Sequence, residues 1–228
     1  MIGPMNTHRS FSFLDRAHLT RLALVAAVLV SIQALGGEAG WVPLFNGKDL
    51  DGWEQKNGLA KYEAQDGVIV GTSVPKSPNS FLCTKKDYSD FELEFEVKVD
   101  KELNSGVQIR SESKPDYQNG RVHGYQVEIA VGGFSGGIYD EARRGKFLNA
   151  QAPTDEIKNL LKENAWNKYR VLCQGKRIQT WVNGVQVTDL TDEMTRSGFI
   201  GLQVHGVGDR TEPLKAMFRN LRLREIKS

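Results

Sequence analysis

Hydrophobic and polar residues alternate most regularly between Phe91 and Val99, in the run Phe-Glu-Leu-Glu-Phe-Glu-Val-Lys-Val. Successive side chains of a β-strand point to opposite faces. The run therefore predicts a strand with its apolar side chains toward a core and its four charged side chains toward water.

Shorter runs of the same kind follow along the chain, separated by the Gly, Asn, Asp and Pro residues typical of turns. They cover residues 68–70, 81–83, 106–110, 124–129, 166–174, 177–182, 185–187, 201–205 and 216–226. The single helix that we expect after residue 40 covers Pro153–Glu163, with Thr154 as its N-cap. A strand–helix–strand rhythm, a dinucleotide fingerprint and a phosphate loop are all missing from the sequence. The pattern therefore predicts an all-β fold, a jelly-roll sandwich of two antiparallel sheets.

The first forty residues have a different character. Three arginines precede an apolar run, Leu22–Leu35, which is shorter than the about 20 residues needed to span a bilayer. Small residues follow it, up to an expected cleavage site after Ala39. We expect a signal peptide over residues 1–39 and a mature domain over 40–228, exported to the periplasm or the extracellular space without stable membrane insertion. The alternative is an uncleaved membrane anchor.

Charge and cysteine content narrow the function classes. The chain has 30 Lys and Arg against 28 Asp and Glu, a formal net charge of +2. It has no basic stripe interleaved with aromatic residues, so a nucleic-acid partner is not indicated. Cys83 and Cys173 lie in apolar, strand-like contexts, where they either pair or remain buried as free thiols. Cys-x-x-Cys spacing is absent, so neither a zinc site nor a redox site is indicated.

Three predicted strands repeat one polar pattern, a glutamine followed two residues later by a chargeable side chain. The pairs are Gln108 and Arg110, Gln126 and Glu128, and Gln203 and His205. Glutamine amides donate and accept hydrogen bonds at once, which suits sugar hydroxyls. Histidine titrates near neutrality and a buried glutamate can be raised toward it, so both can carry protons. We expect a polar concave groove lined by these six residues. The alternatives are ordinary half-buried strands, an Arg110–Glu128 ion pair on adjacent strands, and a surface His205.

A second polar cluster follows a glycine-rich turn, as residues at a groove rim often do. It comprises Tyr139, Asp140, Glu141, Arg143 and Arg144, and its alternative is a charged, solvated turn. Three tryptophans are either sugar platforms or, as is more common in a sandwich, core residues: Trp53, Trp166 and Trp181. The nucleophile motif Gly-x-Ser-x-Gly and the zinc motif His-Glu-x-x-His are absent.

Taken together, eight stretches that run in order along nearly the whole mature chain resemble the 3-keto-disaccharide hydrolase family. They are Leu44–Trp53, Ser105–Arg110, Gly124–Ile129, Gly137–Glu141, Trp166–Arg170, Trp181–Gly184, Gly201–Gly206 and Phe218–Leu221. This family is similar in fold to concanavalin-type lectins and glucanases. The resemblance therefore implies a concanavalin-like jelly roll that binds a carbohydrate, a 3-keto-glycoside.

The resemblance also implies a reaction. A ketone at C3 acidifies the proton on C2, a base removes that proton, the C1 leaving group departs by β-elimination, and water can add back. Glu128 or His205 would be the base and the other the acid, with Arg110 stabilising the enolate oxygen. The side chains expected to contact the substrate are Gln108, Gln126, Tyr139, Asp140, Arg143 and Gln203. The sequence neither requires nor excludes a divalent cation, and it indicates no other cofactor. The rival functions are a non-catalytic carbohydrate-binding module and an extracellular interaction domain, because a fold does not fix a function.

Overall fold

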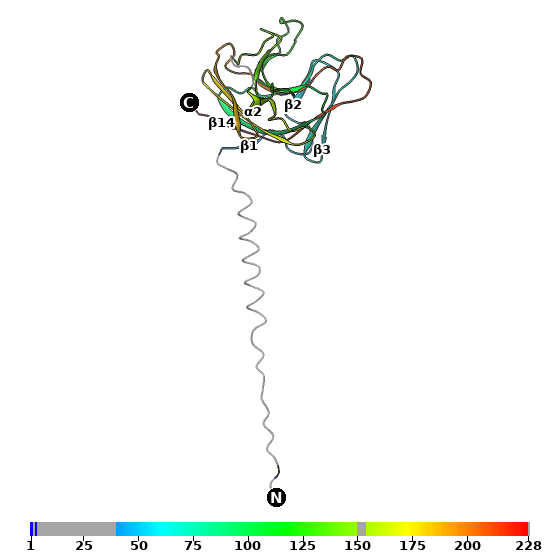
Figure 1. Cartoon of the computed structure of the whole chain (residues 1–228), viewed down its shortest axis with the longest axis vertical. Coiled ribbons are helices and arrows are strands. Elements are labelled where there is room, and N and C mark those ends of the chain that lie inside the picture. Colours follow the sequence, from blue (N-terminus) through cyan, green and yellow to red (C-terminus); the bar gives the residue numbers. More distant parts are fainter. Residues whose placement is uncertain (2, 4–39, 150–153, 228) are drawn as a thin grey trace. The chain divides into compact units, whose positions relative to one another are not determined.

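Two antiparallel β-sheets make up the domain that begins at Trp41. The computed structural model describes residues 1, 3, 40–149 and 154–227 (Figure 1). The expected signal peptide, apart from Met1 and Gly3, lies outside the described residues. Within the described part of the chain, no helix has the length and apolar character needed to cross a membrane.

Eight strands form the larger sheet, in the order β12, β11, β10, β6, β14, β4, β3, with β1 paired to β14. Their bounds are β1 Val42–Pro43, β3 Lys61–Gln65, β4 Val68–Thr72, β6 Phe91–Val99, β10 Asn167–Gln174, β11 Arg177–Val182, β12 Val185–Thr191 and β14 Lys215–Glu225.

Six strands form the smaller sheet, in the order β2, β5, β13, β7, β8, β9. Their bounds are β2 Trp53–Lys56, β5 Ser80–Thr84, β7 Ser105–Glu112, β8 His123–Ile129, β9 Ile138–Glu141 and β13 Phe199–Val204. In Figure 1 the labels of β1, β3 and β14 follow one layer, and β2 lies above it in the other. The predicted all-β sandwich of two antiparallel sheets is confirmed.

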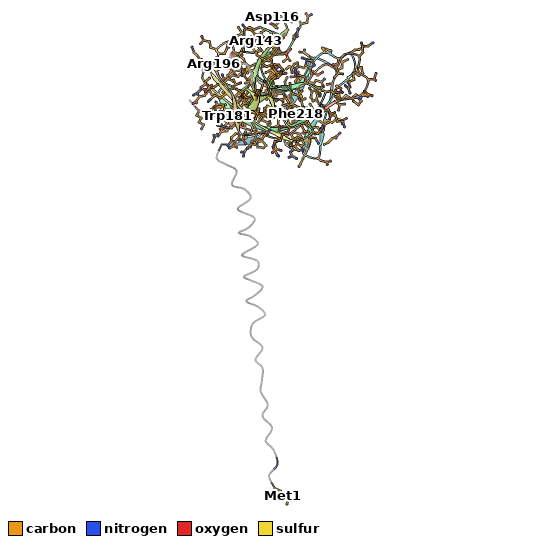
Figure 2. All side chains as sticks on the ribbon, viewed as in Figure 1. Met1, Asp116, Arg143, Trp181, Arg196 and Phe218 are labelled. Carbon is orange, nitrogen blue, oxygen red and sulfur yellow. The ribbon has the colours of Figure 1, made fainter. Side chains whose placement is uncertain are left out.

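The core lies between the two sheets, where their apolar faces meet. Leu93 and Phe95 of β6 pack in one cluster with Val107 of β7 and Val127 of β8, and all four are at most 1% exposed. The side chains in Figure 2 fill this interior, and Phe218 of β14 is fully buried within it. The alternation that predicted β6 thus describes its core face correctly.

The opposite face of β6 differs from the prediction, because its glutamates are paired rather than simply solvated. Glu92 is 5% exposed, since Arg170 of β10 and Arg224 of β14 both bind its carboxylate. Glu94 is held in the same way by Arg222 and Lys168. The outer face of the larger sheet is therefore a charge-paired surface.

The three tryptophans have structural contacts. Trp53 is buried and its indole N–H donates to the carbonyl of Leu44 at 3.1 Å. Arg219 stacks on Trp166 and Arg170 on Trp181, each with its guanidinium carbon 4.1 Å from the ring centroid. Such cation–π contacts contribute to the charge-paired surface of the larger sheet.

The helix is much shorter than predicted. α2 covers Asp155–Lys158, and the hydroxyl of its N-cap Thr154 accepts a hydrogen bond from the backbone N–H of Ile157 at 3.3 Å, as the sequence indicated. The expected continuation to Glu163 is wrong. Beyond α2 the N–H of Leu160 closes one further turn on the carbonyl of Ile157 at 3.3 Å, and the carbonyl of Leu160 accepts from the side chain of Asn183 at 2.8 Å. The expected start at Pro153 lies outside the described residues.

The two cysteines are free and buried, one associated with each sheet. Cys83 of β5 packs in a small cluster with Phe81, Val122 and Phe199, whereas Cys173 of β10 belongs to the main core. Burial raises the pKa of both thiols, that of Cys173 to about 12. Both side chains therefore behave as apolar packing groups.

Candidate functional site

Register across the smaller sheet places several glutamines and a glutamate on one face, which we call the polar face. Gln108 of β7 is opposite Gln126 of β8, and Gly106 is opposite Glu128. The alternate residues of these strands point into the core, so the glutamine and glutamate side chains point away from it. A Cβ on Gly106 would lie 2.5 Å from the amide carbon of Gln126, so a side chain there would displace this amide.

A pocket of about 320 Å³ opens on the polar face, and we call it the acidic pocket. Its lining residues are Asn79, Asn104, Gln126, Glu128, Tyr139, Glu141, Phe147 and His205. The structure therefore brings together four of the expected catalytic and substrate-binding residues, Gln126, Glu128, Tyr139 and His205, with Glu141 of the rim cluster.

A chain of side-chain hydrogen bonds leads along the polar face to Glu128. Ser111 donates to Gln108 at 2.6 Å, and Gln108 donates to the carbonyl oxygen of Gln126 at 2.8 Å. Gln126 in turn donates to Glu128 Oε2 at 2.8 Å, and Asn104 donates to Glu128 Oε1 at 2.6 Å. Both carboxylate oxygens of Glu128 are thus fixed by amide donors, which orients the group in the pocket.

Burial shifts the titration of both carboxyl groups in the acidic pocket. It raises the pKa of Glu128, while hydrogen bonds from Gln126 and Asn104 and the charge of His205 act in the opposite direction. Burial also raises the pKa of Glu141, against the opposing charges of Arg121 and His205. Glu141 further raises the pKa of Glu128 by like-charge repulsion. Perturbed carboxyl groups of this kind are typical of catalytic sites.

His205 is oriented by the backbone. Its Nδ1 lies 2.8 Å from the carbonyl oxygen of Gly206, which can only accept, so Nδ1 carries a hydrogen and donates. Nε2 is then the nitrogen that gains or loses a proton. Asn79 fixes this turn by accepting a hydrogen bond from the backbone N–H of Gly206 at 2.9 Å. Burial, followed by the charges of Glu141 and Glu128, raises the pKa of Tyr139, whose hydroxyl therefore stays protonated.

The family model of the 3-keto-alpha-glucoside-1,2-lyase-like domain matches residues 40–224. The chain belongs to this family. No curated protein matches it in sequence.

Several solved structures are similar in fold to this lyase-like domain at low sequence identity. A protein from Parabacteroides distasonis ATCC 8503, assigned as a glycosyl hydrolase, is 19% identical with a TM-score of 0.60, and the match covers 82% of this chain and 94% of that one. The carbohydrate-binding module CBM66 from Bacillus subtilis is 17% identical with a TM-score of 0.55, over 79% of this chain and 98% of the module. A β-glucanase from Bacillus licheniformis is 13% identical with a TM-score of 0.54, over 84% of this chain and all 100% of that enzyme. These likenesses establish the jelly-roll fold.

Arg110 of the lyase-like domain does not lie in the acidic pocket. The register of β7 shifts between Ile109 and Glu112, and Arg110 has a φ of 47°, so it is the extra residue of a bulge. Its side chain is fully buried, where it donates to the carbonyls of Ser89 and Gly175 and pairs with Asp90 at 2.8 Å. Ser111 occupies the place on the polar face that simple alternation would give to Arg110.

Asp140 and Arg143 also lie away from the acidic pocket. Asp140 is opposite Tyr125 in the β8–β9 pairing, and both residues are fully buried on the core side. Asp140 pairs with Arg143 at 2.7 Å and with Arg144, and the Arg143 guanidinium carbon lies 4.7 Å from the centre of the Tyr125 ring. These ion pairs join β9 to the loop that follows it.

Two of the glutamines, Gln108 and Gln203, do not line the acidic pocket. Gln108 acts through Gln126, as described above. Gln203 is fully buried, opposite Phe81 in the β13–β5 pairing, and neither of its amide atoms has a hydrogen-bond partner among the described residues.

Four pocket residues were not expected as site residues from the sequence: Asn79, Asn104, Glu141 and Phe147. Glu141 was noted only as part of the rim cluster, although it follows Tyr139 by two residues and so shares its face of β9. The other three lie outside the strands of the smaller sheet, where no periodic signal marks them.

Two larger cavities are present elsewhere in the domain. One, of about 540 Å³, lies over β6 and β14 beside Glu94 and Arg222. The other, of about 560 Å³, lies beside β12 and is lined mainly by apolar side chains. Of these three cavities, the acidic pocket alone is lined by a histidine. Among the described residues, no group of three or more His, Cys, Asp or Glu side chains is arranged to hold a metal ion.

Proposed function

We propose that this protein cleaves 3-keto-glycosides at C1, by abstraction of the C2 proton and β-elimination, after export and removal of residues 1–39. The observation that carries the proposal is the acidic pocket itself, which combines Glu128, Glu141 and His205 in one poorly solvated space. The family of the domain and its carbohydrate-active fold support the same conclusion.

Glu128 is the base in this proposal. Its pKa is raised by burial, so its carboxylate is a stronger base than an exposed glutamate near neutral pH. The amides of Gln126 and Asn104 hold the carboxylate in one orientation. The electron pair of the C2–H bond then forms the C1–C2 double bond and the C1 oxygen leaves with its bonding electrons.

His205 is the acid that protonates this leaving oxygen through Nε2. Glu128, Glu141 and His205 line one pocket, which places the proposed acid beside the proposed base. If the two roles are exchanged, His205 must be deprotonated to act as the base and Glu128 must be protonated to act as the acid.

The negative charge that develops on the C3 oxygen needs a hydrogen-bond donor in the pocket. Arg110 is held elsewhere, and Tyr139 takes this role in the proposal because its raised pKa keeps the hydroxyl protonated. Addition of water to the resulting unsaturated 3-keto sugar would complete a net hydrolysis.

Glu141 favours a second candidate, classical hydrolysis of an unoxidised glycoside. That chemistry requires two carboxyl groups on either side of the bond, about 5 to 9.5 Å apart. Glu128 and Glu141 line one pocket, and the raised pKa of each fits the role of the acid in such a pair.

One experiment separates these functions. Methyl and phenyl 3-keto-glucosides and the matching unoxidised glucosides are incubated with the protein in deuterated water and followed by NMR. The proposal predicts release of the leaving group from the 3-keto forms alone, with deuterium at C2 and a transient unsaturated 3-keto sugar. Hydrolysis of the unoxidised glucosides without exchange at C2 would instead establish the second candidate. Sugar binding without any turnover would identify a binding module.

A further inference from the structure

The cavity beside β12, which we call the apolar cavity, has a volume of about 560 Å³. Six of its lining side chains are apolar: Phe134, Phe147, Leu148, Ile157, Val187 and Leu190. Phe134 is one of the exposed large apolar side chains, with 46% of its surface accessible to solvent. Small-molecule sites are typically lined in this way, by apolar and aromatic side chains.

The polar groups in the wall of the apolar cavity bond mainly to the protein itself. Asn149 accepts a hydrogen bond from the backbone N–H of Ile138 at 2.8 Å and donates to the hydroxyl of Thr188. Thr188 donates to the carbonyl of Gly136 at 3.0 Å, and Asp189 is paired with Arg177. Thr154 accepts from the backbone N–H of Ile157, so every polar lining side chain apart from Gln186 has a bond within the protein, and the wall offers mainly carbon surface.

Phe147 connects the apolar cavity with the acidic pocket, because it lines both. Its ring stacks on Phe134 with centroids 5.2 Å apart, and its other neighbour is the ring of Tyr139, edge to face at 5.3 Å. These three rings form a continuous aromatic wall from the carboxyl groups to the apolar cavity.

The size of the acidic pocket limits what it can hold. Its 320 Å³ lies at the lower end of the about 300–1,000 Å³ found for small-molecule sites, which suits a single sugar ring. The remainder of a glycoside must then lie outside it, and the aromatic wall leads to the apolar cavity.

We propose that the apolar cavity is a leaving-group subsite that binds an apolar aglycone, aryl or alkyl, in preference to a second sugar. This inference rests on the proposed function, in which the sugar ring occupies the acidic pocket. A second sugar would place its hydroxyls against carbon surface and lose their hydrogen bonds to water.

Ligand-observed NMR and kinetics test the proposal with the full mature chain. Dissociation constants are measured for phenyl, octyl and methyl glucoside and for a glucose disaccharide, with wild type, Phe134→Ala and Leu59→Ala. Leu59 is a matched control, since it is 66% exposed and lines neither cavity. Thermal unfolding checks that each variant is folded.

We expect wild type to bind the phenyl and octyl glucosides at least tenfold more tightly than the methyl glucoside or the disaccharide. Phe134→Ala should weaken phenyl glucoside by about tenfold, the scale of a lost aromatic contact, and leave methyl glucoside unchanged. Leu59→Ala should change neither. Equal affinity of wild type for all four ligands, or equal loss of both ligands in Phe134→Ala, overturns the subsite. If Phe134→Ala does not fold, the wild-type ranking alone decides.

Turnover is read separately, so that the subsite and the reaction can fail independently. A phenyl preference in binding without turnover of any 3-keto-glucoside supports the subsite and refutes the proposed function. Turnover of phenyl and disaccharide 3-keto-glycosides with equal kcat/KM supports the function and refutes the subsite.

Discussion

Asn104 offers a direct way to perturb the proposed base. Its side-chain amide donates to Glu128 Oε1 at 2.6 Å, and this hydrogen bond lowers the Glu128 pKa against the effect of burial. The Asn104 carbonyl oxygen has no hydrogen-bond partner among the described residues. Asn104→Ala therefore removes one donor to Glu128 and strands no other protein group.

The size of the effect follows from the strength of that bond. A hydrogen bond to a charged group contributes about 1.5–3 kcal/mol, and one pKa unit corresponds to about 1.4 kcal/mol. Loss of the donor should thus raise the Glu128 pKa by about 1–2 units. The rise is smaller if a water molecule replaces the amide as donor. A base must be ionised to act, so activity is lost as pH falls through its pKa.

The assay is kcat/KM for a 3-keto-glucoside across pH 4 to 9. The acid limb of the profile should move to higher pH by about 1–2 units in Asn104→Ala, with the rate at the plateau changed much less. Asn79→Ala is the matched control, because Asn79 lines the same pocket but bonds to the backbone of Gly206. An unmoved acid limb in folded Asn104→Ala, or an equal shift in the control, would refute the assignment of Glu128 as base.

Three further predictions concern single residues. Glu128→Gln and His205→Ala should remain folded by circular dichroism yet lose about 10²–10⁴ in turnover; a fully active His205→Ala protein would remove His205 from the mechanism. The folded-state pKa of Glu141 is raised above the ordinary value of 4.5, so its contribution to stability is present below that pH and is lost as pH rises. Glu141→Gln should therefore have a higher free energy of unfolding than wild type at pH 8 and no advantage at pH 4 in urea titrations, and equal curves at both pH values would contradict this. Arg110→Ala should lower the free energy of unfolding by about 3–5 kcal/mol, as expected for breaking a buried ion pair, while kcat per folded molecule changes little; a large loss of kcat in a stable Arg110→Ala protein would restore Arg110 to the site.

Local pattern was sufficient for most of the strands, but β1, β2, β3 and β9 were not predicted from the sequence. The alternation of Phe91–Val99 predicted β6 to the residue, because a period of two is imposed by strand geometry itself. The helix was over-extended for the opposite reason. The helix does not continue past Leu160, whose carbonyl accepts a hydrogen bond from Asn183, a side chain distant in sequence.

The site was predictable only where it depends on alternation. Gln126 and Glu128 share the polar face because they are two residues apart in one strand. Arg110 departs from this rule through a bulge, and a bulge depends on pairing with β13 and β8 rather than on the residues beside it. Asn104 and Phe147 line the pocket from loops, which have no periodic pattern, so their position beside Glu128 and Tyr139 is known only from the folded structure.

The two buried, free cysteines can report local unfolding of the domain without any added label. Cys83 lies with the smaller sheet and Cys173 in the main core, so each thiol is shielded by a different part of the sandwich. A thiol reagent can reach either one only when its surroundings open, and its rate of labelling then measures the free energy of that opening. The two rates, read by mass spectrometry with and without a sugar ligand, would tell whether occupying the acidic pocket tightens the smaller sheet alone or the whole domain.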